Sequence, residues 1–158
     1  KQIPGSQLLA VDTNESRADI AKTLGLPFTT EASACDCDLV IHASGRSQGL
    51  SSALSMAGPE ARIVELSWYG NEPVTVPLGH AFHPNRLELK SSQVGQIPPR
   101  RQPRWNYARR LELALQLLRA PELDNLISGE SRFDELPAVA STLLSPAGDA
   151  LCHRITYS

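Results

Sequence analysis

The sequence has few of the features that mark secreted or membrane proteins. It contains 3 cysteines, and a single residue separates Cys35 from Cys37, so we expect no disulfide framework. No apolar run approaches the roughly 18 residues that a membrane span requires. The formal net charge is -2, which gives no general attraction for nucleic acid. These absences favour a cytoplasmic protein with no membrane or nucleic-acid partner.

The sequence also lacks a Gly-rich phosphate loop where one would be expected. Residues 7–25 form a hydrophobic run that ends at Asp12, followed by a helical stretch that Gly25 closes. In a dinucleotide-binding fold this would be the second strand with its helix, and a GxGxxG loop would lie about twenty residues earlier. Only 11 residues precede Asp12, and the first residue is lysine rather than methionine. We therefore expect a C-terminal piece of a larger cofactor-binding protein.

Apolar runs and helical periodicities alternate along the rest of the chain, which at 158 residues is long enough for one domain. The pattern predicts strands at residues 8–12, 27–30, 38–44, 61–69, 87–94 and 151–157, and an extended segment at 73–78. It predicts helices at residues 16–24, 47–57, 104–119 and 133–144. Thr13 or Asn14 is the expected N-cap of the first helix. In the third helix, the expected core face consists of Ala108, Leu111, Leu115 and Leu118.

This alternation predicts an α/β fold, a Rossmann-like parallel sheet with helices on both faces that lacks its first strand and Gly-rich loop. The strands at 8–12, 38–44, 61–69 and 87–94 are expected to lie side by side.

The order of four segments resembles the C-terminal half of the zinc-type medium-chain alcohol dehydrogenases, a group that includes sorbitol and threonine dehydrogenases. These segments are VDTNESR, AKTLG, DLVIHASG and ARIVELSWYG, and the resemblance covers nearly the whole chain. It implies that residues 1–158 form a partial nucleotide-binding domain, whose last segment (about 121–158) returns toward a catalytic domain outside this sequence. It also implies an NAD(P)-dependent enzyme that moves hydride between a small alcohol or carbonyl substrate and nicotinamide. Zinc is expected only in that other domain.

Asp12 is the leading candidate for cofactor binding. A carboxylate at the end of this strand accepts the ribose hydroxyls and repels a 2′-phosphate, so NAD is expected over NADP. Arg17 lies at the start of the next helix, where the resemblance places a basic residue beside the adenosine ribose. The alternatives are a solvated Asp12 that begins a turn, and a surface Arg17 paired with Glu15 or Asp19.

Further cofactor contacts are expected where the later strands end, because loops at the carboxyl ends of parallel strands face the ligand crevice. Ser44 and Gly45 end the third strand, and the alternative is a turn that needs glycine for its geometry. The resemblance places the backbone of Leu66, Ser67 and Trp68 beside the nicotinamide carboxamide, with Ser92 and Gln93 also near the nicotinamide. Trp68 and Tyr69 would wall the pocket, or else pack against the catalytic domain.

No catalytic residue and no metal ligand is expected within this chain. His80 and His83 share an HxxH spacing but lie beside Gly79 and Pro84, which favour a loop. His42 is expected to be a packed core histidine. A group of arginines and aromatics at residues 100–110 favours a solvated loop and helix start over nucleic-acid binding. A noncatalytic binding or association module is the alternative function, and the protein is a possible homo-oligomer.

Overall fold

Every strand pair in the described part of the chain is parallel. A computed structural model describes residues 3–33, 35–145 and 148–157. This range divides into two units. One runs from Glu31 to Arg104, and the other combines the chain up to Thr30 with the chain from Trp105 onward. Parallel strands with intervening helices confirm the predicted α/β class.

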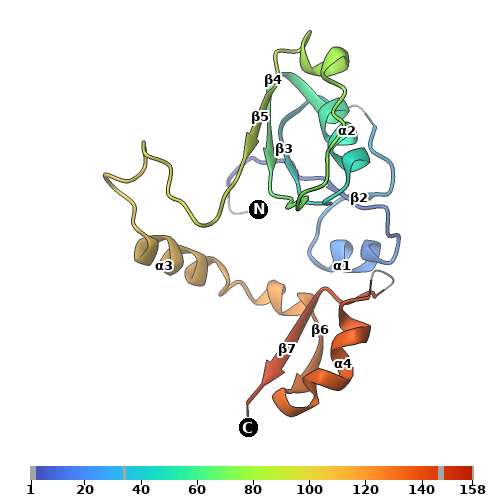
Figure 1. The fold of residues 1–158 in the computed structure, drawn as a ribbon, viewed down its shortest axis with the longest axis vertical. Helices are drawn as coiled ribbons and strands as arrows, with labels where there is room; N and C mark the ends of the chain where they lie inside the picture. The colour runs from blue at the N-terminus through green and yellow to red at the C-terminus, as the bar shows by residue number, and fades with distance from the viewer. Residues whose placement is uncertain (1–2, 34, 146–147, 158) are drawn as a thin grey trace. The chain divides into compact units, whose positions relative to one another are not determined.

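The unit from Glu31 to Arg104 is built on a three-stranded sheet. Its strands are β3 (Cys37–His42), β4 (Ala57–Glu65) and β5 (Glu88–Ser91), in the order β3-β4-β5. These are three of the four strands that were predicted to lie side by side. Helix α2 (Ser47–Met56) connects β3 to β4 and covers one face of the sheet (Figure 1).

The core of this unit lies between α2 and the sheet. Leu50, Ala53 and Leu54 recur at the spacing of one helical face, and all three are buried. They pack with Ile63 on β4, which has no exposed surface, and with Leu87 just before β5. This helical stripe is the feature that orients α2 on the sheet.

The other unit begins with a strand pair around a helix. Strand β1 (Ala10–Val11) pairs with β2 (Phe28–Thr29), and α1 (Arg17–Thr23) lies between them in sequence. Gly25 follows α1 at φ +62°, as the predicted helix end requires. The predicted N-cap was wrong, because Ser16 occupies that position. The prediction that 8–12 joins the larger sheet was also wrong, because β1 belongs to a separate two-stranded sheet.

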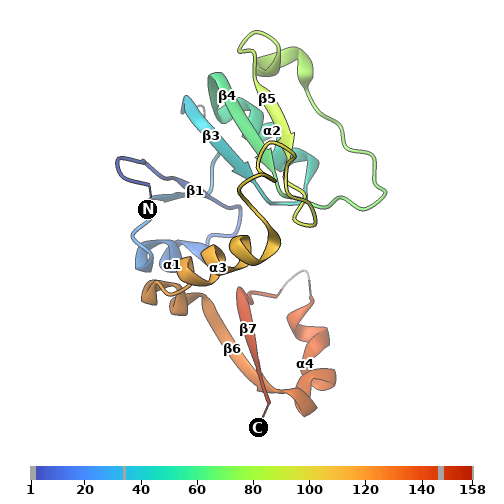
Figure 2. The same ribbon diagram turned by 90° about the vertical axis from the view of Figure 1, so that its left-hand side faces the viewer.

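The same unit contains the C-terminal third of the chain. Helix α3 (Tyr107–Leu117) is followed by the 3-10 helix η2 (Pro121–Leu126) and by β6 (Ile127–Arg132). The 3-10 turn η3 (Phe133–Glu135) leads into α4 (Leu136–Leu143), which lies along the β6-β7 pair (Figure 2). Strand β7 (Cys152–Thr156) pairs with β6. Pro137 lies in the first turn of α4, where proline is tolerated.

Several predicted boundaries differ from the structure. Strand β4 begins at Ala57 and ends at Glu65, so the predicted strand at 61–69 starts and ends too late. Residues 73–77 form no strand, and residues 78–82 form the short element η1 (Leu78–Phe82), which is interrupted by the non-helical backbone angles of His80. Strand β6 was not predicted, because its sequence ISGESR contains one large apolar residue.

The predicted core face of α3 was wrong. Its leucines are exposed, with Leu111 at 60%, Leu115 at 56% and Leu118, just beyond the helix, at 64%. The N-terminus of the helix is capped, because the Asn106 side chain accepts a hydrogen bond from the Arg109 backbone N–H at 2.8 Å. The amphipathic pattern therefore formed a helix without a covered apolar face.

Candidate functional site

Three of the predicted binding segments meet at the carboxyl edge of the β3-β4-β5 sheet. The register pairs His42 with Glu65 and Glu65 with Ser91, so the three strands end at the same level. Backbone hydrogen bonds continue one residue further, from Leu66 N to His42 O and from Ser92 N to Glu65 O, both at 2.8 Å. The loops that begin at Ala43, Leu66 and Ser92 therefore leave the sheet side by side.

Gly45 turns the chain from β3 toward α2. Its φ of +65° lies in the left-handed region that favours glycine, although a Cβ there would meet nothing within 4 Å. The Gly45 backbone N–H donates to the Ser67 Oγ at 3.0 Å. This contact joins the loop after β3 to the loop after β4, which brings together two segments that the sequence predicted separately.

A buried His42–Glu65 pair lies beneath these loops. The side chains are 6% and 11% exposed, and His42 Nδ1 lies 2.7 Å from Glu65 Oε2. The other ring nitrogen, Nε2, lies 2.7 Å from the Ser44 Oγ. The prediction that His42 is buried is confirmed, but its surroundings are polar at both ring nitrogens.

Glu65 is the acceptor on which this network converges. Besides His42, its carboxylate accepts hydrogen bonds from the Ser67 backbone N–H at 2.7 Å and from the Tyr69 hydroxyl at 3.0 Å. Burial opposes ionisation of Glu65, but hydrogen bonds from Ser67, His42 and Tyr69 outweigh it and lower its pKa. Burial and the hydrogen bond to Glu65 raise the pKa of Tyr69. The pair therefore holds a carboxylate in its ionised form.

Helix α2 approaches this network closely at Gly49. A Cβ on that residue would lie 2.2 Å from the Ser44 Oγ and 2.8 Å from His42 Nε2. Both distances are shorter than real Cβ contacts, so Gly49 is the position that lets the helix pass over the network. Its requirement is one of space rather than of backbone conformation.

The remaining predicted residues of this edge face solvent. Trp68 is 86% exposed, and Leu66 is also exposed. Ser92 and Gln93 are exposed, and the Gln93 Oε1 accepts a hydrogen bond from the Gly95 N–H. The edge therefore offers backbone groups and an indole ring on its surface, above the buried His42–Glu65 pair.

Asp12 and Arg17 lie in the other unit, around the start of α1. Asp12 is exposed, and its Oδ1 accepts a hydrogen bond from the Asn14 N–H at 2.9 Å. Arg17 pairs with Asp149, not with Glu15 or Asp19, and its Nη1 lies 2.9 Å from the Asp149 backbone oxygen and 3.3 Å from Oδ1. A hydrogen bond from Ser16, helped by one from Asn14 and by the charge of Arg17, lowers the pKa of Asp149 although burial opposes this.

The remaining polar residues in the described part of the chain form no metal site. No group of three or more His, Cys, Asp and Glu residues among residues 3–33, 35–145 and 148–157 could hold a metal ion. Cys35, Cys37 and Cys152 are free thiols. A hydrogen bond with Cys35, together with burial and the negative charges nearby, raises the pKa of the Cys37 thiol to about 11.

In the region of the chain that the structure covers, no helix is both long and apolar enough to cross a membrane.

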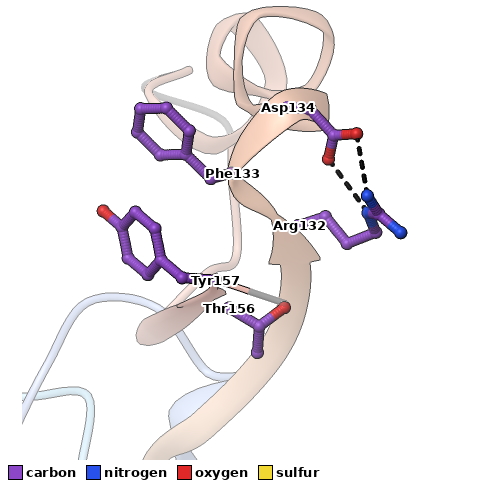
Figure 3. A pocket seen from close by; sticks show the side chains of 5 residues that line it. All are labelled: Arg132, Phe133, Asp134, Thr156 and Tyr157. Atoms are coloured by element: carbon purple, nitrogen blue, oxygen red, sulfur yellow. Dashed lines mark hydrogen bonds and ion pairs between the residues drawn. The ribbon is translucent and has the colours of Figure 1, made fainter.

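An open pocket is lined by none of the residues predicted to bind the cofactor. It has a volume of about 370 Å³ and is lined by Arg132, Phe133, Asp134, Thr156 and Tyr157 (Figure 3). The Phe133 and Tyr157 rings stack with centroids 5.0 Å apart. Arg132 is held by Asp134 through contacts of 3.0 and 3.1 Å. The guanidinium of Arg132 and the carboxylate of Asp134 are thus paired with each other.

Sequence reasoning missed Glu65 as a site residue and underestimated His42. The available signal was that each is an ionisable residue at the end of an apolar run, in strands predicted to be neighbours. Aligning the starts of the two predicted strands, at residues 38 and 61, would have placed the pair together. Ser131 and His153 form a comparable contact between β6 and β7 at 2.6 Å, but β6 itself was not predicted.

The sequence matches no model of a protein family and no curated protein. The structure, in contrast, is similar to solved dehydrogenases. It superposes on a short-chain alcohol dehydrogenase from Escherichia coli in complex with NADH, with a TM-score of 0.68 and 18% identity over 95% of this chain. It superposes on L-idonate 5-dehydrogenase from Escherichia coli with a TM-score of 0.71 and 12% identity over 96% of this chain.

A third similar structure is glucose dehydrogenase from Haloferax mediterranei in complex with NADP, zinc and gluconolactone. Its TM-score is 0.67, with 14% identity over 96% of this chain. The chain spans only 43–44% of the length of these three proteins. The comparisons confirm that the chain has the fold of part of an alcohol, polyol or sugar dehydrogenase.

Proposed function

We propose that this chain is part of an NAD(P)-dependent, zinc-type alcohol or polyol dehydrogenase and that the carboxyl edge of β3-β4-β5 lies against the dinucleotide. The observation that carries the proposal is the meeting of three strand ends at one edge of a parallel sheet, where Gly45 and Ser67 join the loops after β3 and β4. Ligands of open α/β sheets bind at such edges. The similarity to dehydrogenases solved with NADH or NADP supports the cofactor class.

In this proposal each segment of the edge contacts a different part of the cofactor. Ser44 and Gly45 approach the middle of the dinucleotide, and Gly45 allows the backbone to come close. The backbone of Leu66–Trp68 hydrogen-bonds the nicotinamide carboxamide, with Ser92 and Gln93 beside it. Asp12 accepts the adenosine ribose hydroxyls, and NAD is preferred over NADP. The Arg17 guanidinium, held by Asp149, lies at the start of the helix that follows Asp12.

Among the described residues, no group of three or more His, Cys, Asp and Glu could hold a zinc ion. We propose that zinc is held by a catalytic domain outside these 158 residues, to which residues 121–158 return. This chain's share of hydride transfer is then to hold the nicotinamide in a fixed place. The parent protein is proposed to be a cytoplasmic homo-oligomer.

The test is to compare the 158-residue chain with the complete protein that contains it. We expect the complete protein to bind NADH saturably and to reduce NAD with a primary or secondary alcohol or a polyol from a panel. We expect the isolated chain to have no dehydrogenase activity with added zinc and NAD. A complete protein that binds neither NADH nor NADPH would disprove the proposal and favour a noncatalytic association module.

Asp12→Ser tests the ribose contact. The substitution removes a ribose acceptor and a charge that repels a 2′-phosphate, so NADH should bind more weakly while NADPH loses less or gains. Removal of one charged hydrogen bond predicts a loss of about 10- to 100-fold for NADH. Titration of both cofactors by fluorescence measures the ratio, and Asp19→Ser, within α1, is the matched control. An unchanged ratio of the two affinities would remove Asp12 from the site.

A further inference from the structure

We propose that His42 and Glu65 are positioning residues that fix the Ser44 hydroxyl as a hydrogen-bond acceptor for the nucleoside part of the ligand. The ligand groups that fit are donors, such as a ribose hydroxyl or an amide NH₂, and not phosphate oxygens. The inference rests on the dinucleotide site proposed above, and it adds to that site two buried residues that do not touch the ligand themselves.

The carboxylate of Glu65 determines which atom donates in each of these hydrogen bonds. An ionised carboxylate has only acceptors, and this one receives the Ser67 backbone N–H and the Tyr69 hydroxyl as well as His42 Nδ1. At 2.7 Å from Oε2, Nδ1 must therefore be the donor of its bond. The pKa of Glu65, lowered by these same bonds, keeps the carboxylate an acceptor.

The proton on Nδ1 of His42 in turn determines the role of the Ser44 hydroxyl. A neutral imidazole that is protonated at Nδ1 has a lone pair at Nε2. In the proposal the ring is neutral, and Ser44 Oγ, 2.7 Å from Nε2, then donates its only proton to that lone pair. The Arg46 backbone N–H occupies one Oγ lone pair at 3.2 Å. Ser44 is exposed whereas His42 is 5% exposed, so the second lone pair is what the edge presents to a ligand.

The charge beneath the edge selects the same kind of ligand. With a neutral His42, the pair carries the single negative charge of Glu65, close under Ser44. The diphosphate of a dinucleotide has no proton to donate at neutral pH and would be repelled by this charge. A hydroxyl or amide donor satisfies the Ser44 lone pair and meets no repulsion.

Ser44, His42 and Glu65 also have the spacing of a serine nucleophile, its base and the carboxylate that orients the base. Two contacts favour a positioning role for Ser44 instead. Its Oγ accepts the Arg46 N–H, and it lies so close to α2 that a Cβ on Gly49 would come within 2.2 Å of it. Labelling of Ser44 by a fluorophosphonate probe would assign it as a nucleophile and overturn the inference.

The protonation state of His42 can be measured on the 158-residue chain without a ligand. The ¹⁵N spectrum of the histidine side chains should show His42 protonated at Nδ1 only. Ser44→Ala should shift the Nε2 resonance and leave Nδ1 protonated, whereas Glu65→Gln should perturb Nδ1. Ser55→Ala, an exposed serine of α2, should change neither resonance. A proton on Nε2 in the wild-type chain, in either the neutral or the charged ring, would overturn the inference.

Ligand selectivity gives the second readout, in the complete protein. Ser44→Ala should weaken NADH about 3- to 10-fold, because one neutral hydrogen bond is lost. It should leave the affinity for inorganic pyrophosphate unchanged, and Ser44→Thr should restore NADH binding. Equal losses for NADH and pyrophosphate would contradict the assignment. If the wild type binds no NADH, the proposed function fails, and the ¹⁵N spectrum still decides how Ser44 is held.

Discussion

Two glycines serve the carboxyl edge of the sheet for different physical reasons. Gly45 supplies a positive φ in open space, whereas Gly49 has ordinary backbone angles and no room for a side chain. The sequence pointed to the first, because a glycine directly after an apolar run is typical of a strand-to-helix turn. It could not point to the second, since the neighbours of Gly49 are set by how α2 crosses β3.

Gly49→Ala is therefore expected to destabilise the chain. The new Cβ would lie 2.2 Å from the Ser44 Oγ, and relief of that contact must break a bond of the His42 network or tilt α2. Overpacking of this kind costs about 1–3 kcal/mol of unfolding free energy. Urea unfolding measures the loss. Gly79→Ala is the control, because a Cβ at Gly79 meets nothing within 4 Å, and an equal loss in both variants would contradict this account.

Glu65 makes part of the stability dependent on pH. Its pKa is lower in the folded protein than its ordinary value of 4.5. The unfolded state therefore binds more protons in acid, and the contribution of Glu65 is present above pH 4.5 and lost as the pH falls through the folded pKa.

Glu65→Gln should remove this dependence. At pH 7 the variant should be less stable by about 1–3 kcal/mol, because charged hydrogen bonds are lost, and the gap to the wild type should narrow below pH 4. Urea unfolding across pH 3–7 measures it. Glu60→Gln, whose exposed partner is Arg86, should change the free energy by less than about 1 kcal/mol at any pH. A constant gap for Glu65→Gln would show that its charge is unimportant.

At the scale of elements, local sequence patterns predicted most helices and strands but not their environments. The stripe Leu50, Ala53 and Leu54 and the amphipathic leucines of α3 are alike in sequence. The first is buried against Ile63, and the second is exposed. Periodicity fixes which residues share a helix face, whereas burial depends on whether another element covers that face.

Strand β6 shows the opposite failure. Its sequence carries little apolar signal because small residues face a histidine on the neighbouring strand. A Cβ on Gly129 would lie 2.8 Å from His153 Nδ1, and Ser131 Oγ lies 2.6 Å from His153 Nε2. Here the strand is specified by its partner β7 and not by its own hydrophobicity. Single-strand reasoning cannot find such an element.

The contrast between the two helices predicts different costs for leucine substitutions. Leu54→Ala should cost about 3–5 kcal/mol of unfolding free energy, since Leu54 is 2% exposed in the core. Leu115→Ala should cost less than about 1 kcal/mol, because Leu115 is 56% exposed. Urea unfolding of both variants checks this. A large loss for Leu115→Ala would mean that its side chain is covered in solution.

At the scale of the whole molecule, both the comparisons and the exposed apolar side chains support the proposal that this chain is part of a larger protein. The dehydrogenases with this fold are more than twice as long as the 158 residues here, which span 43–44% of them. The apolar side chains that this chain leaves exposed are arranged in ordered faces. Leu39 and Ile41, on the face of β3 opposite the core residue Val40, are 52% and 62% exposed.

We therefore expect the isolated chain to self-associate. Strand β3 is an edge of its sheet among the described strands, and an edge with exposed apolar residues is a template for pairing with another chain. The face of α3 that carries Leu111 and Leu115 adds apolar area. Light scattering after size exclusion should show species larger than 17.2 kDa whose proportion rises with concentration.

Charged substitutions distinguish the two surfaces. Leu39→Lys with Ile41→Lys should shift the chain toward monomer if edge pairing dominates, because inward or edge lysines block strand addition. Leu111→Lys with Leu115→Lys should do so if the α3 face dominates. Neither pair should lower the unfolding free energy by more than about 1 kcal/mol, since all four side chains are substantially exposed. A wild-type chain that stays monomeric at high concentration and melts cooperatively would show that these apolar faces need no partner.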